Sequence, residues 1–161
     1  MQKRTAFKLC LAGATAVALN AAPVAVFAKD EPLKVAFVYV SPANEEGWSS
    51  QHDIARKFVE EKFGDKIKVT WIENIPENAD AQRVIRDLAQ QGNKIIFATS
   101  FGYMNSVMKV AKQFPNVYFE HATGYKTSKN VKNYTARFYE GRYLAGMLAA
   151  ATTKTNILGY V

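Results

Sequence analysis

Apolar residues along the chain follow two alternating patterns. Nearly continuous apolar runs occupy residues 33–40, 94–99 and 117–119, and residues 67–72 alternate between apolar and polar, so these four stretches predict strands. Between them, apolar side chains recur at helical spacing in three sets: Ile54, Ala55, Phe58, Val59 and Phe63; Val84, Ile85, Leu88 and Ala89; and Val107, Val110, Ala111 and Phe114. Strands that start about every 30 residues, with helices between them, predict βαβ units and a doubly wound parallel α/β sheet.

The final part of the chain predicts further elements. Residues 132–136 predict another strand, and residues 139–151 predict a helix with small side chains on one face: Gly141, Ala145, Gly146 and Ala149. Residues 156–161 then begin a fresh apolar strand, at which the chain stops. A domain rarely stops inside a buried strand, so the pattern indicates that part of the fold is missing. The uncovered edge predicts a tendency to dimerise or aggregate.

The first 28 residues have the composition of an export signal. Their start is positively charged, residues 9–27 are mostly apolar or small, and Val26-Phe27-Ala28 has the small-x-small form of a signal-peptidase site. Cys10 lacks the run of small residues that precedes a lipid-anchor site. We therefore expect cleavage near Ala28 and a periplasmic mature chain that is not a lipoprotein. Functions that need ATP or NAD lose support in that compartment.

Composition then narrows the function classes. Removing residues 1–28 from the 161 leaves 133, enough for one domain with a core, and lowers the net charge from +7 to +4 because two lysines and one arginine leave. The remaining lysines form no basic stripe in the sequence, which disfavours nucleic-acid binding. The single cysteine leaves with the signal, and two histidines cannot fill an ordinary zinc site alone. Catalytic motifs are also missing from the sequence, so we expect no enzyme activity, metal or cofactor.

Polar loops follow each predicted strand. In a doubly wound sheet, ligands bind beyond the carboxyl ends of the strands, which here are residues 41–47, 73–78, 100–102 and 121–124. These loops are rich in Ser, Thr, Asn, Glu and Gly, and aromatic residues flank them: Trp48, Phe101, Tyr103 and Tyr125. Polar groups between aromatic faces predict a pocket for a small, flat, hydrogen-bonding ligand.

Each candidate site residue has two interpretations, a ligand contact or a purely structural role. Trp48 either stacks on a ligand ring or plugs the start of the first helix, and we favour stacking. Ser100, Phe101 and Gly102 either present backbone N–H groups to a ligand or form a turn with an inward Phe. His121 either hydrogen-bonds at the pocket or is a core histidine. We expect ligand contacts from the whole set: Trp48, Ser49, Ser100, Phe101, Gly102, His121 and Thr123.

Several long motifs carry a resemblance to a known family. They are Gly47-Trp48, Gln51-His52-Asp53, residues 79–85 (ADAQRVI), 98–104 (ATSFGYM), 119–125 (FEHATGY) and 136–146 (ARFYEGRYLAG). Together they resemble the basic membrane protein family, substrate-binding proteins of ABC importers related to purine nucleoside receptor A. The resemblance implies two α/β lobes of the type I periplasmic-binding-protein kind, joined by a hinge, with a purine base or nucleoside held between them.

The resemblance also assigns parts of the chain. Residues 1–28 correspond to the signal peptide, 29–155 to the N-terminal lobe and 156–161 to the start of a crossover strand, while the second lobe is missing. Trp48 matches the aromatic residue that stacks on the base. Thr123 stands where the nucleoside-binding branch has an Asp, so the base contacts must differ, and the local sequence suggests a base such as adenine.

The resemblance implies the solute-binding component of an ABC importer, with a permease in the inner membrane as its partner. Two other classes stay open. An exported α/β hydrolase acting on nucleosides would turn over inosine or adenosine. A periplasmic sensor or interaction module would co-purify with a membrane receptor instead of a permease.

Overall fold

The computed structural model describes residues 31–160 with the exception of Glu45. The expected export signal, its cleavage position at Ala28 and the new start at Lys29 lie outside the described residues, as does Val161. Within the described part, every predicted βαβ unit is present. The elements run in the order β1 (Leu33–Val38), α1 (Trp48–Phe63), β2 (Ile67–Ile72), α2 (Ala79–Gln90), β3 (Ile95–Ala98), α3 (Met104–Ala111), β4 (Tyr118–Ala122), β5 (Val131–Tyr134) and α4 (Phe138–Thr152). Short 3-10 helices η1 (Gly64–Lys66) and η2 (Phe101–Tyr103) precede β2 and α3.

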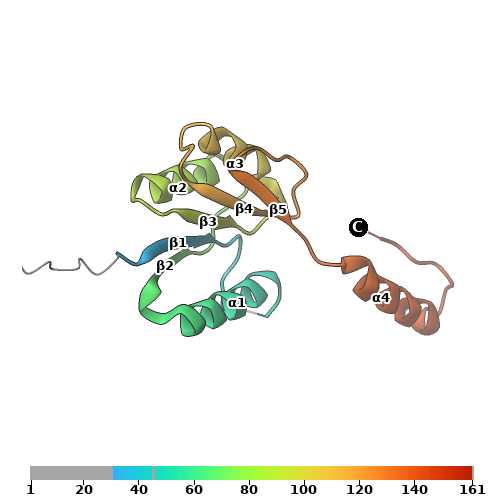
Figure 1. Cartoon of the computed structure of the whole chain (residues 1–161). Helices are drawn as coiled ribbons and strands as arrows, with labels where there is room; N and C mark the ends of the chain where they lie inside the picture. Colours follow the sequence, from blue (N-terminus) through green and yellow to red (C-terminus); the bar gives the residue numbers. More distant parts are fainter. Residues whose placement is uncertain (1–30, 45, 161) are drawn as a thin grey trace, which may run out of the picture. The chain divides into compact units, whose positions relative to one another are not determined.

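The strands form one parallel sheet in the order β2-β1-β3-β4-β5, which confirms the predicted fold class (Figure 1). The register brings the strand ends together: Val38 lies opposite Ile72 on one side and Ala98 on the other, and Ala98 lies opposite His121. Because all the strands run the same way, the loops after them meet at one edge of the sheet. This edge is the one at which the sequence predicts a ligand pocket.

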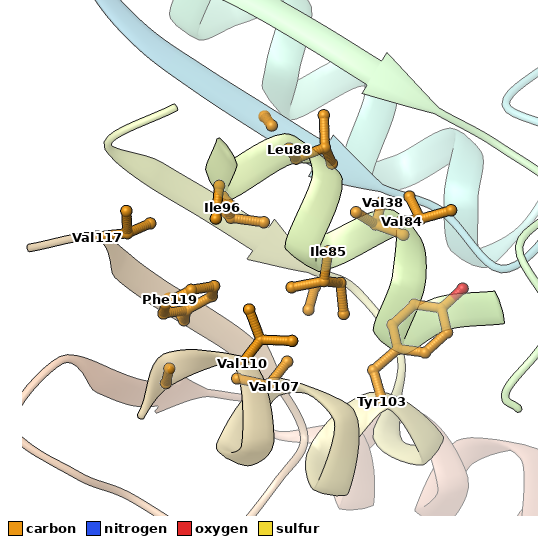
Figure 2. Close-up of a cluster of buried hydrophobic side chains, with 14 of the residues drawn as sticks. Val38, Val84, Ile85, Leu88, Ile96, Tyr103, Val107, Val110, Val117 and Phe119 are labelled. Atoms are coloured by element: carbon orange, nitrogen blue, oxygen red, sulfur yellow. The ribbon is translucent and has the colours of Figure 1, made fainter. Parts of the chain in front are cut away.

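The main apolar core lies between the sheet and the pair α2 and α3. Ile85 and Leu88 of α2 and Val107 and Val110 of α3 are buried at 1% exposure or less, against side chains from the strands such as Ile96 (Figure 2). The apolar positions that predicted these two helices are therefore the ones that pack. Gly92 takes a φ of 87° just after α2, a conformation that favours glycine.

Helix α1 covers the opposite face and packs in a way that its apolar pattern did not indicate. Its buried residues are Ser49, Asp53 and Arg56, while Ile54 and Phe58 are more than half exposed. The helix exists where predicted, but its polar side faces the sheet. The reason is that Asp53 and Arg56 pair with each other, and burial of paired polar groups can replace burial of apolar ones.

Helix α4 also occupies the predicted residues, yet it contains no buried residue. Large apolar side chains along it are exposed, among them Tyr143, Leu144, Met147 and Leu148. Residues 156–160, for which the sequence predicts a strand, form no strand with any described residue. A strand needs a hydrogen-bonded neighbour, and the described part of the chain supplies none for this segment.

Candidate functional site

Trp48 is the first residue of α1 and is held at the carboxyl edge of the sheet. Gly47 precedes it with a φ of 118°, a conformation that glycine adopts without strain, and so turns the chain into the helix. The indole Nε1–H of Trp48 donates to the carbonyl oxygen of Thr99, 2.5 Å away, at the end of β3. The ring centroid lies 4.8 Å from that of His52 and 5.7 Å from that of Phe138. A hydrogen bond and two aromatic neighbours thus fix the orientation of the indole.

A hollow of about 790 Å³ lies beside this indole and gathers four of the predicted site residues. Its lining includes Trp48, Ser100, Phe101 and Thr123, together with Val40 from the end of β1 and residues of α4: Phe138, Gly141, Arg142 and Ala145. The four residues come from the loops after β3 and β4 and the start of α1, elements far apart in sequence. Aromatic faces beside hydroxyl groups suit a flat ligand with polar edges.

A second hollow of about 500 Å³ lies on the α1 side and shares Trp48, Thr123 and Phe138 with the first. Tyr134 at the end of β5 also lines it, and burial raises the pKa of its phenol, so this hydroxyl stays neutral and able to donate. His52 lines the same hollow, and its Nδ1 lies 2.9 Å from the carbonyl oxygen of Trp48, one turn earlier in α1. The motifs alone gave Tyr134 and Phe138 no role.

Thr123 sits between the two hollows in a strained backbone conformation. Its φ is 62°, in the left-handed region, which is unfavourable for a β-branched residue by about 1–2 kcal/mol. Its N–H donates to the carbonyl oxygen of Tyr134 at 2.8 Å, and its hydroxyl donates to its own neighbour, the carbonyl oxygen of Ala122, at 2.6 Å. Strain of this kind gathers where a binding site fixes the backbone.

Ser100 and Gly102 lie at the predicted position but already have a partner. The hydroxyl of Ser100 donates to the carboxylate of Glu77, and the N–H of Gly102 donates to the same oxygen, Oε1, at 2.9 Å. Phe101 between them is 54% exposed, with its ring 6.4 Å from that of Tyr125. Sequence reasoning placed Glu77 in one of the edge loops but gave it no role, because nothing local shows which side chain from another loop will reach Ser100.

His121 and Ser49 lie beneath the site and line neither hollow. His121 is 1% exposed; its Nε2 donates to the carbonyl oxygen of Ser100 at 2.7 Å, and its Nδ1 lies 3.3 Å from Oδ1 of Asn133 on β5. Its ring thus ties the loop after β3 to β4 and β5. Ser49 is buried, and its hydroxyl lies 2.7 Å from that of Ser41, which orders the loop between β1 and α1. Through these contacts, His121 and Ser49 stabilise the loops that form the pocket.

A buried polar cluster anchors α1 below the pocket. Asp53 accepts from Nε of Arg56 at 2.7 Å and lies 2.9 Å from Nζ of Lys57, and the Tyr39 hydroxyl reaches it at 3.5 Å. Burial alone would raise the pKa of the Asp53 carboxyl, but hydrogen bonds and charges from Arg56 and Lys57 outweigh it and hold the pKa below its usual value. The guanidinium of Arg56 also stacks 3.9 Å from the ring centroid of Trp71 on β2.

The described residues bring together no group of three His, Cys, Asp or Glu side chains that could hold a metal ion. No described helix combines the length and apolar character that crossing a bilayer requires.

The fold and the position of the hollows indicate a ligand-binding α/β protein. A parallel α/β unit with a ligand-sized hollow beyond the carboxyl ends of its strands is the usual arrangement in proteins that bind small molecules. The comparisons with known proteins agree. The sequence profile of PnrA-like ABC transporter substrate-binding proteins matches residues 33–161. The chain belongs to this family, which confirms the resemblance seen in its motifs.

Individual relatives extend this result. A purine-binding protein of Brucella abortus is 55% identical over 132 residues, covering 82% of this chain and 38% of the relative. An ABC transporter protein of Haloferax volcanii, named for glucose binding, is 40% identical over 131 residues, covering 81% of this chain and 33% of that protein. A solved ABC transporter solute-binding protein of Conexibacter woesei matches the fold with a TM-score of 0.61 at 22% identity, covering 73% of this chain and 40% of the other. The chain thus spans less than two fifths of these curated relatives.

Proposed function

We propose that this chain forms the lobe that first receives a purine base or nucleoside in a solute-binding protein of an ABC importer. The observation that carries the proposal is Trp48, whose indole is fixed by its bond to Thr99 beside a hollow lined by Ser100, Phe101 and Thr123. The 55% identity to a protein named for purine binding supports the choice of ligand. Adenine is the base that we expect, as the sequence of the loop after β4 suggests.

The proposed binding mode depends on which polar groups of the pocket already bond to other groups of the protein. The ligand ring stacks on Trp48, which contributes about 1–3 kcal/mol. The Ser100 hydroxyl is directed at Glu77, so the polar edge of the ring pairs with groups around Thr123, which lines both hollows. One stacking face and one or two hydrogen bonds correspond to a dissociation constant of about 1 mM, or about −4 kcal/mol.

In a protein with both lobes, the second lobe closes over the ligand and the permease in the inner membrane recognises the closed form. Closure adds contacts from the second lobe, so the affinity rises and occupancy is converted into a shape that the permease can bind. The protein acts in the periplasm after export, and it does not transform its ligand.

The test is a Trp-fluorescence titration of the purified protein. Trp71→Phe leaves Trp48 as the reporter, and Trp48→Phe, with Trp71 as the reporter, is the matched control. Saturable quenching by adenine or adenosine in the first variant and not in the second supports the proposal. A folded protein that responds equally in both variants, or not at all up to millimolar purine, contradicts it.

Two further ligands separate the alternatives in the same titration. Glucose is included because the Haloferax relative is named for it, and a response to glucose without one to purines would replace the purine assignment. Chromatography of the adenosine after incubation distinguishes a binding protein from a hydrolase, because a hydrolase would release free adenine and ribose.

A further inference from the structure

Two hydrogen-bond donors converge at the start of η2, on the loop that lines the larger hollow. Ser100 precedes η2 in an extended conformation, and its hydroxyl and the N–H of Gly102 donate to the same acceptor. Backbone N–H groups and a hydroxyl arranged in this way are the donors that proteins commonly use for phosphate or carboxylate. In this structure their acceptor is part of the protein itself.

The acceptor is the carboxylate of Glu77, from the loop between β2 and α2. Its Oε1 accepts from both donors, and its carboxyl carbon lies only 2.3 Å from where a Cβ on residue 102 would stand, so the close approach requires Gly102. The loop is fixed from behind: the N–H of Ile75 donates to the carbonyl oxygen of Tyr39 at 3.1 Å, and the hydroxyl of Tyr103 donates to the carbonyl oxygen of Ile75 at 2.5 Å. The carboxylate is thus a built-in anion.

We propose that Glu77 is a specificity-determining residue, which fills the anion position at Ser100 and Gly102 and thereby excludes phosphorylated ligands from the adjoining hollow. The inference rests on the proposed function and deepens it. A neutral base or nucleoside pairs with the rest of the pocket unhindered. A nucleotide meets a carboxylate where its phosphate would need donors. Among the described residues that line the larger hollow, Arg142 is the one with a positive charge, and it comes from α4.

The size of the effect follows from the charges. Two unit charges about 7 Å apart at a wet surface, with an effective dielectric constant of about 40, change an affinity about tenfold. Glu77→Gln keeps an oxygen for both donors but removes the charge. The variant should therefore raise the affinity for adenosine monophosphate, relative to adenosine, about tenfold. Glu61→Gln is the matched control, because Glu61 is an exposed acid near the far end of α1 from Trp48.

The first experiment measures both ligands by Trp48 fluorescence in the Trp71→Phe background, with the full chain and each glutamine variant. A relative gain for the monophosphate in Glu77→Gln, absent in Glu61→Gln, supports the inference. Adenosine binding in every variant with a monophosphate-to-adenosine ratio that stays within twofold of the parent overturns it, while the proposed function survives.

A second experiment does not depend on purine binding. Amide NMR spectra of the parent protein and of Glu77→Ala are recorded during a titration with inorganic phosphate. A saturable shift of the Gly102 amide in Glu77→Ala alone supports the inference, even if adenosine binds to no variant and the proposed function fails. The same shift in both proteins, or in neither, overturns the inference, and retained amide dispersion shows that the variant is folded.

Discussion

The buried pair of Asp53 and Arg56 offers a sharp test of how α1 is attached. In Asp53→Asn the guanidinium of Arg56, which is 4% exposed, loses the carboxylate that lies 2.7 Å from its Nε. Removing one partner of a buried ion pair costs about 3–5 kcal/mol, since the other charge is left uncompensated. Arg56 keeps its contacts with Glu60 and Trp71. We therefore expect a loss of about 2–3 kcal/mol in the free energy of unfolding.

Urea unfolding at pH 7, followed by far-ultraviolet circular dichroism, measures this loss. The midpoint should fall while the denaturant slope stays constant, because the surface exposed on unfolding hardly changes. Adding Arg56→Met to the Asp53→Asn variant removes the buried guanidinium that has lost the Asp53 carboxylate, and should recover part of the stability. A single variant within about 0.5 kcal/mol of the parent would refute the reasoning, because that is the range of an ordinary surface substitution.

The same pair predicts how stability depends on pH. The pKa of Asp53 in the folded protein lies below its unfolded value, so the ionised carboxylate stabilises the fold fully above the unfolded pKa. This contribution is lost as the pH falls through the folded pKa, that is, below about pH 4. The double variant should show a shallower acid dependence than the parent. Equal slopes in acid would contradict the assignment of this carboxylate as a stabilising group.

Two further substitutions have expected outcomes. Gly124→Ala should destabilise the fold by about 1–3 kcal/mol in thermal or urea unfolding, because the new Cβ would stand 2.0 Å from Nδ1 of the buried His121; Gly146→Ala, which meets nothing within 4 Å in α4, is its matched control and should be neutral or stabilising. The exposed apolar face of α4 should cause concentration-dependent association in analytical ultracentrifugation, and Leu144→Glu with Leu148→Glu should reduce it; a parent protein that stays monomeric at high concentration would contradict this.

The apolar pattern predicted most of the fold, for a physical reason. Strands and helices of a doubly wound sheet each have a local hydrophobic period, and the positions with that period in α2 and α3 are the ones that the structure buries. Helix α1 is the exception in packing. Its apolar period was correct for a helix but not for the face that packs, because Asp53 and Arg56 satisfy each other inside the protein. A pairing of that kind leaves no periodic signal.

The sequence predicted the location of the candidate site, because the topology of the sheet determines it, but not the hydrogen bonds within the site. The loops after parallel strands must meet at one edge, and that rule brought Trp48, Ser100, Phe101 and Thr123 to one hollow. Which groups still have free hydrogen bonds depends on side chains from other loops. The hydrogen bonds of Glu77 with Ser100 and of His121 below the pocket join residues far apart in the sequence, so no local pattern could indicate them.

The unequal packing of the helices has a consequence for hydrogen exchange. Helices α2 and α3 share the large apolar cluster, whereas α1 is joined to the sheet mainly by the Asp53 cluster and by Trp48. Its amides should therefore exchange through a local opening that leaves the other helices intact. Because Trp48 leaves with α1, each opening also dismantles the pocket. A ligand that binds only the closed form would slow exchange in α1 by one plus the ratio of the free ligand concentration to its dissociation constant. The attachment of this helix and the affinity of the site are therefore one linked equilibrium.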